Sequence, residues 1–120
     1  GVMPQEIEVW YILPALRREF SKLMLEKGLS QRQIAKKLYI TEAAVSQYLK
    51  GKRGKNFEFK EDIKQDIIAS AQRVMEHGNM IPEFQMLCRK IRENGFLCDI
   101  HKKHGITQEE CNQSIICLEK

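Results

Sequence analysis

Two closely spaced helix starts, with room for only one short helix and a tight turn between them, constrain the fold of this chain more than any other feature. The segment Ser30-Gln-Arg-Gln33 is a capping box, in which the Ser hydroxyl and the Gln side chain each satisfy a backbone amide. Thr41 is a second N-cap residue, and it opens a helix that we expect over residues 42–50. Only a few residues remain for the connection, so the sequence predicts two short helices joined by a tight turn.

The apolar positions of these two helices fit a packed pair. Ile34, Ala35 and Leu38 form the inner face of the first helix, and Val45 is a buried knob on the second. The outward side of the second helix carries short side chains, which can lie against base edges in the major groove of DNA. The segment is therefore predicted to be a helix-turn-helix that reads DNA.

Residues around these helices are candidates for contacts to the DNA backbone. Helix starts favour phosphate through their free amides and the helix dipole, and basic residues follow the second helix. The alternative is that these basic residues form a solvated loop. The candidate DNA-binding residues, those for bases and those for phosphates together, are Gln31, Gln33, Thr41, Glu42, Ala43, Ser46, Gln47, Lys50, Lys52 and Arg53.

Helical spacing also dominates the rest of the chain. Pro14 is expected in the first turn of a helix that ends at Gly28, and Pro82 is expected to start a helix that reaches residue 94. A long helix is predicted over residues 58–77, and Thr107 caps a last helix to about residue 118. No useful segment alternates with period two, so the predicted fold class is all-α.

The same pattern suggests an organisation in three parts. Residues 1–57 form the predicted helix-turn-helix domain, residues 58–80 a long connecting or dimerisation helix, and residues 81–120 a small helical tail that contains all four cysteines. A single recognition helix covers few base pairs, so we expect a homodimer that binds two related half-sites.

Composition narrows the class of protein without naming a partner. The net charge is +4, and residues 1–80 carry the whole excess, which is compatible with double-stranded DNA as a polyanion partner. No apolar run is long enough to cross a membrane and no export signal begins the chain, so a cytoplasmic location is expected. No phosphate-binding loop, zinc-protease motif or arguable nucleophile set occurs, so the sequence predicts neither an enzyme nor a small-molecule substrate.

The four cysteines, Cys88, Cys98, Cys111 and Cys117, all fall in the last third of the chain. They are candidate ligands of an iron–sulfur cluster or of zinc, because thiolates are soft ligands that suit both. Their spacing is wide and irregular, which favours a cluster held between helices over a compact zinc knuckle. His101 is a reserve ligand. Burial as small apolar residues and a thiol–disulfide switch remain alternatives.

The segment Gly-Leu-Ser-Gln…Ile-Ala…Thr…Ala-Val-Ser-Gln-Tyr-Leu-Lys-Gly-Lys-Arg-Gly resembles the Cro/C1-type (XRE) helix-turn-helix family. It looks like the version found in a group of archaeal predicted transcription regulators that also carry a cysteine-bearing tail. The likeness is good over residues 12–55 and looser elsewhere. Tyr39 departs from it, because the family commonly has Gly in this turn, and a Tyr there needs a left-handed or adjusted backbone.

The resemblance implies a sequence-specific transcription regulator, and it favours an iron–sulfur cluster that senses iron, oxygen or redox state. Two other functions remain open. One is a regulator whose tail is stabilised by zinc and whose effector is separate. The other is a protein-interaction module that uses the same helices without binding DNA.

Overall fold

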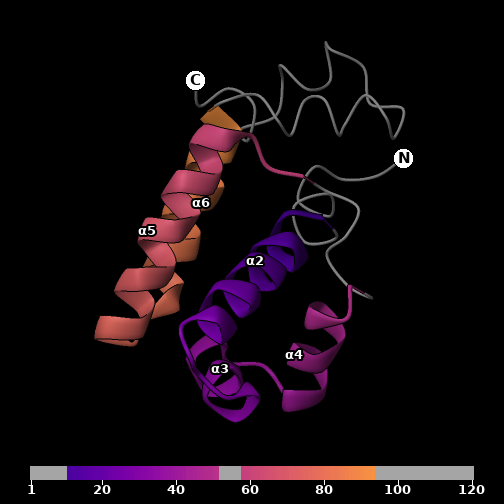
Figure 1. Ribbon diagram of the computed structural model, residues 1–120. Helices are drawn as coiled ribbons and strands as arrows, with labels where there is room; N and C mark the ends of the chain where they lie inside the picture. Colours follow the sequence, from indigo (N-terminus) through magenta and orange to yellow (C-terminus); the bar gives the residue numbers. More distant parts are fainter. Residues whose placement is uncertain (1–10, 52–57, 94–120) are drawn as a thin grey trace.

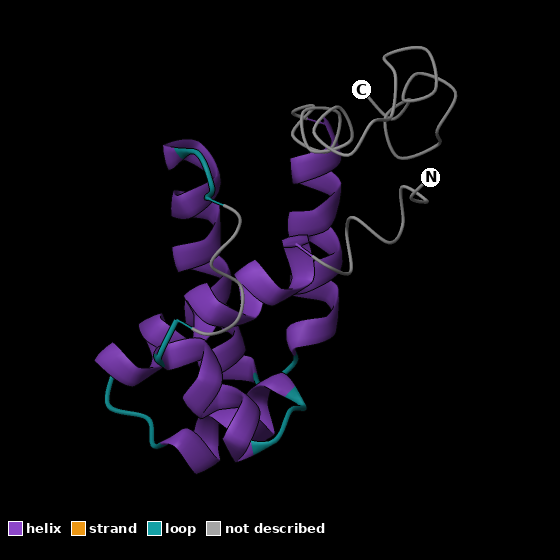
Figure 2. Cartoon of the chain, turned by 90° about the vertical axis from the view of Figure 1, so that its right-hand side faces the viewer, coloured by secondary structure: helices purple, strands orange, loops and turns teal. Residues whose placement is uncertain are grey.

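The computed structural model describes residues 11–51 and 58–93 of the chain. These residues form helices α2 (Leu13–Glu26), α3 (Gln31–Leu38), α4 (Glu42–Leu49), α5 (Glu61–His77) and α6 (Met80–Glu93) (Figures 1 and 2). No strand occurs among them, so the predicted all-α class is confirmed for the described part of the chain. The helix expected after Thr107 lies outside it.

Helix α2 is the central element of the fold. It packs against α3 and α4 on one side and against α5 on the other, as its position between them in Figure 1 shows. Pro14 lies in its first turn, where a missing amide hydrogen breaks no helical bond. Leu16, Phe20 and Met24 are fully buried along it, at the helical spacing that the sequence indicated.

Helices α5 and α6 form a hairpin connected by Gly78 and Asn79. Gly78 has a φ of 79°, a left-handed conformation that ends α5 without the steric cost a side chain would add. The Asn79 side chain then accepts a hydrogen bond from the Ile81 amide at 3.2 Å and so caps the start of α6. A change of chain direction is thus completed within two residues.

Two helix starts differ from the sequence prediction. Helix α6 begins at Met80 and not at Pro82, because Asn79 supplies the cap and Pro82 fits within the first turn. Helix α5 begins at Glu61 and not at residue 58. Its first turn carries Glu61 and Asp62, whose charges suit the positive end of the helix dipole.

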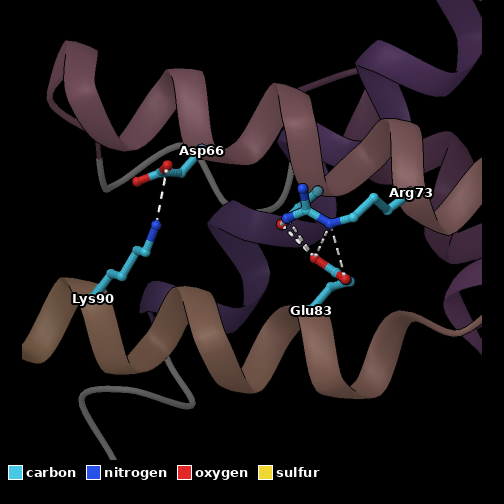
Figure 3. Close-up of polar contacts among 5 residues, drawn as sticks. Asp66, Arg73, Glu83 and Lys90 are labelled. Atoms are coloured by element: carbon cyan, nitrogen blue, oxygen red, sulfur yellow. Dashed lines mark hydrogen bonds and ion pairs between the residues drawn. The ribbon is translucent and has the colours of Figure 1, made fainter.

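One continuous apolar core connects all five helices. It contains the buried faces of α5 and α6. The ring centroids of Phe20 on α2 and Phe84 on α6 lie 4.8 Å apart, and the two rings meet edge to face. The hairpin is also joined on its outer side, where Arg73 contacts Glu83 and Lys90 contacts Asp66 (Figure 3). The helix-turn-helix segment therefore rests on a helical support that includes α5 and α6.

None of the helices described has both the length and the apolar content that a bilayer crossing requires.

Candidate nucleic-acid interface

The start of α3 is fixed by the capping box that the sequence predicted. The Gln33 amide donates to the Ser30 hydroxyl at 3.1 Å, and the Ser30 amide donates to the Gln33 side-chain oxygen at 2.8 Å. Gln31 and Gln33 are both exposed. The carbonyl of Gln33 is used within the cap, so the NH₂ group is the part of this side chain left to donate to a phosphate.

The turn between the two helices contains a strained residue. Tyr39 has φ 56° and ψ 42°, and it is the only residue other than glycine with a positive φ in the described chain. The Ile40 amide donates to the Ala35 carbonyl at 3.0 Å, which closes the end of α3. Of the left-handed or adjusted backbone expected for Tyr39, the structure therefore has the left-handed form, and the Tyr39 side chain is 64% exposed.

Helix α4 has a buried side and an accessible side. Thr41 caps it by accepting a hydrogen bond from the Ala44 amide at 3.1 Å. Ala44, Val45 and Tyr48 are buried, which confirms the inner face predicted for this helix. Because α4 lies at the edge of the molecule, its other side is not covered by the described chain (Figure 1).

The accessible side of α4 carries the residues that the sequence proposed for reading bases. Thr41, Glu42, Ala43 and Lys50 are exposed, and Ser46 and Gln47 are half-buried. The burial of Ala44 and Val45 between them shows why these residues face outward, since successive helical positions turn by about 100°. Lys52 and Arg53, the remaining two candidates, lie outside the described residues.

Two further exposed residues belong to this surface but were not selected from the sequence. Arg32 is exposed between Gln31 and Gln33, at the start of α3, where a cation adds to the attraction for phosphate. A basic residue in the first turn after the N-cap Ser30 was the sequence signal that could have identified Arg32 as a phosphate contact. Tyr39 adds an exposed phenol at the turn, and its predicted place in this turn was a signal of accessibility, since connecting segments run over the surface.

The cysteine site is represented in the described chain by Cys88 alone. Cys88 lies on α6, is 6% exposed, and belongs to the apolar core with Phe84 and Leu87. Cys98, Cys111, Cys117 and His101 lie outside the described residues. Within residues 11–51 and 58–93, no group of three or more His, Cys, Asp or Glu side chains is arranged to hold a metal ion.

Comparison with known proteins bears on the same segment. Neither the curated proteins nor the solved structures that were compared gave a match to the chain. Residues 21–59, which include α3, the Tyr39 turn and α4, do match a family model described as helix-turn-helix, and the match supports the XRE type of this motif. This part of the chain is therefore a helix-turn-helix domain.

Proposed function

We propose that the protein is a sequence-specific DNA-binding transcription regulator with α4 as its recognition helix. The observation that carries the proposal is the division of α4 into a buried side and an accessible polar side, within a segment that matches the helix-turn-helix family. Glu42, Ala43, Ser46 and Gln47 are assigned to the major groove, which admits one helix and presents a distinct pattern for each base pair.

The start of α3 is assigned to the DNA backbone. The exposed residues Gln31, Arg32 and Gln33 surround a helix start whose amides and dipole favour a phosphate group. Lys50, at the end of α4, and Lys52 and Arg53 after it extend the same role. Such contacts fix how the protein sits on the duplex, while the α4 side chains supply sequence preference.

Salt-dependent binding to duplex DNA tests this function directly. Selection from a random duplex pool should enrich one sequence, and its affinity should fall linearly with salt on a logarithmic scale, because phosphate contacts release counterions. A protein-interaction module built on the same helices would enrich no sequence and show no such salt dependence. Failure to retain any duplex at low salt would exclude the regulator.

We infer that the regulator acts as a homodimer. One recognition helix contacts only a few base pairs, and two half-sites about 34–36 Å apart let two helices act together. The enriched sequence should then be two-fold related, and light scattering should give twice the chain mass at tens of micromolar.

We further propose that Cys88, Cys98, Cys111 and Cys117 hold an iron–sulfur cluster that makes DNA binding depend on iron, oxygen or redox state. Four thiols form a soft donor set of the right number, and zinc is the alternative occupant. Cys88 is anchored in the core by α6, so a shared site would tie the following chain to this core. Binding would contribute folding free energy to that segment.

The absorption spectrum and metal content of protein purified without oxygen decide between these occupants. An iron–sulfur chromophore, with iron and sulfide lost on Cys→Ser substitution, supports the cluster. Zinc alone makes the site structural and leaves the effector to be sought elsewhere. Protein with neither metal would contradict the metal site and leave core packing or thiol chemistry as the role of the cysteines. DNA binding is tested separately by the salt experiment.

A further inference from the structure

An open groove lies between the start of α2 and α6, away from the DNA-reading side of α4. It has a volume of about 570 Å³, within the range of small-molecule sites in proteins. Its walls combine apolar and cationic side chains, and the described chain contributes no acidic residue to them. The lining residues are Leu13, Arg17, Met80, Ile81, Phe84, Gln85, Cys88, Arg89 and Arg92.

The apolar part of the groove is made by residues that belong to the core or border it. Met80 and Phe84 are buried, and Leu13 on α2 packs against the core to which they belong. Ile81 is 51% exposed at the edge of the groove, so its side chain offers apolar surface to an occupant. An occupant of this groove would therefore bury apolar surface of its own.

The cationic part contains the guanidinium group of Arg17. The Nε of Arg17 is buried and has no hydrogen-bond partner among the described residues. Its neighbour Arg18, in contrast, contacts Glu19 at 3.2 Å and Glu58 at 3.6 Å. Buried donors are normally paired, so Arg17 differs from Arg18 in having hydrogen-bonding capacity that the described chain leaves unused.

We propose that this groove binds a small organic anion with an apolar body, whose carboxylate or phosphate group pairs with Arg17. The planar guanidinium matches the geometry of both anions and forms two parallel hydrogen bonds with them. Arg89 adds positive charge from α6, and Phe84 and Ile81 cover the apolar body. The site goes beyond DNA binding and does not depend on it.

The position of the groove connects it to the helix-turn-helix. Arg17 and Leu13 lie on α2, and the same helix packs against α4. An anion that bridges α2 and α6 therefore contacts the helix that supports the recognition helix. This connection rests on the proposed function, whereas the binding site itself does not.

Ligand binding to the full-length protein without DNA tests the site. Octanoate and phenyl phosphate serve as probes of the two anion types, with 1-octanol and inorganic phosphate as probes of the apolar and anionic parts alone. We expect octanoate or phenyl phosphate to raise the melting temperature by preferential binding to the folded state, and the other two to leave it unchanged. Calorimetric titration should give saturable binding.

Substitution distinguishes the groove from general surface binding. Arg17→Gln should weaken binding of the responding probe about tenfold or more, since it removes the paired cation. Lys22→Gln removes one charge from an exposed position of the same helix and should leave the affinity unchanged. Arg89→Gln, at an exposed position, should weaken binding with less risk to the fold.

Three results would overturn the proposal. One is the absence of saturable binding of both anionic probes by the wild-type protein. Another is an affinity equal to that of the wild-type protein in both Arg17→Gln and Arg89→Gln, with circular dichroism showing that the two variants are folded. The third is a response to 1-octanol as large as that to the anionic probe that binds, which would mean that the arginines contribute nothing to recognition.

Discussion

Arg73 on α5 and Glu83 on α6 are joined by hydrogen bonds from both Nε and Nη2 of the guanidinium to the carboxylate, at 2.8 to 3.1 Å. Ser70, which is fully buried, donates to the same carboxylate at 2.8 Å and accepts from Arg73 at 3.2 Å. The bonds from Arg73 lower the pKa of Glu83 more than burial raises it, and Ser70 adds to the lowering. The hydrogen bonds to Glu83 in turn raise the pKa of Arg73.

This pair should make part of the free energy of unfolding depend on pH. Because the pKa of Glu83 is lowered in the folded protein, its contribution is present above the ordinary glutamate pKa and is lost as the pH falls through the lowered value. Glu83→Gln should cost about 1 kcal/mol near pH 7 and should flatten the acid side of the stability profile. Urea unfolding from about pH 7 to about pH 3 measures both effects.

The control for this prediction is the second ion pair of the hairpin. Asp66 contacts Lys90 at 3.2 Å, and both side chains are more exposed than Glu83. Asp66→Asn should therefore cost less than about 0.5 kcal/mol. Equal losses for the two substitutions would mean that the bonds from Arg73 and Ser70 add nothing beyond a surface ion pair.

Two buried serines should respond in opposite directions to replacement by alanine. Ser21 on α2 is fully buried, and its hydroxyl has no partner in the described chain. Ser21→Ala should raise the free energy of unfolding by roughly 1 kcal/mol, because an unsatisfied polar group is removed and Ala favours the helix. Ser70→Ala should lower it by about 1–2 kcal/mol, because the bond to Glu83 is lost. Destabilisation by Ser21→Ala would show that this hydroxyl does have a partner.

The left-handed backbone at Tyr39 should be relieved by glycine. The conformation costs a residue with a side chain about 1–2 kcal/mol, and the exposed ring gains little from packing. Tyr39→Gly should stabilise the protein by about 0.5–1 kcal/mol after the extra chain entropy of Gly is subtracted. Tyr39→Ala keeps the strain and loses the ring, so it should not stabilise. A loss of duplex affinity in both variants would assign the exposed phenol to DNA.

Base reading by α4 should show itself as a change in preference between sequences. Gln47→Ala should weaken binding to the enriched duplex by roughly 1–3 kcal/mol and leave random duplex nearly unaffected. Gln72→Ala, at an exposed position on α5, makes the same change away from α4 and should alter neither affinity. Equal losses on both duplexes would remove Gln47 from the base-reading set.

Phosphate anchoring by the basic residues after α4 should appear in the salt dependence. Replacing Lys52 and Arg53 together by Ala should lower affinity for every duplex and flatten the logarithmic salt slope by about two. The slope is obtained from affinities at a series of salt concentrations, and the Lys22→Gln protein should keep the wild-type slope. An unchanged slope in the double variant would leave these residues as a solvated segment.

The local features of this protein were readable from its sequence. The capping bonds of Ser30 and Thr41 span only three residues, so the residues themselves fix where α3 and α4 begin. The buried faces of α4, α5 and α6 follow from helical spacing, which needs no knowledge of the partner helix. The strain at Tyr39 was equally local, because it arises in the short turn between the end of α3 and the start of α4.

The remaining features depend on which helices meet, and only the tertiary structure decided them. Arg73 and Glu83 pair because α5 and α6 pack side by side, a relationship between residues ten positions apart on different helices. The groove at Arg17 likewise exists only where α2 and α6 come together, because two helices must supply its apolar and cationic walls.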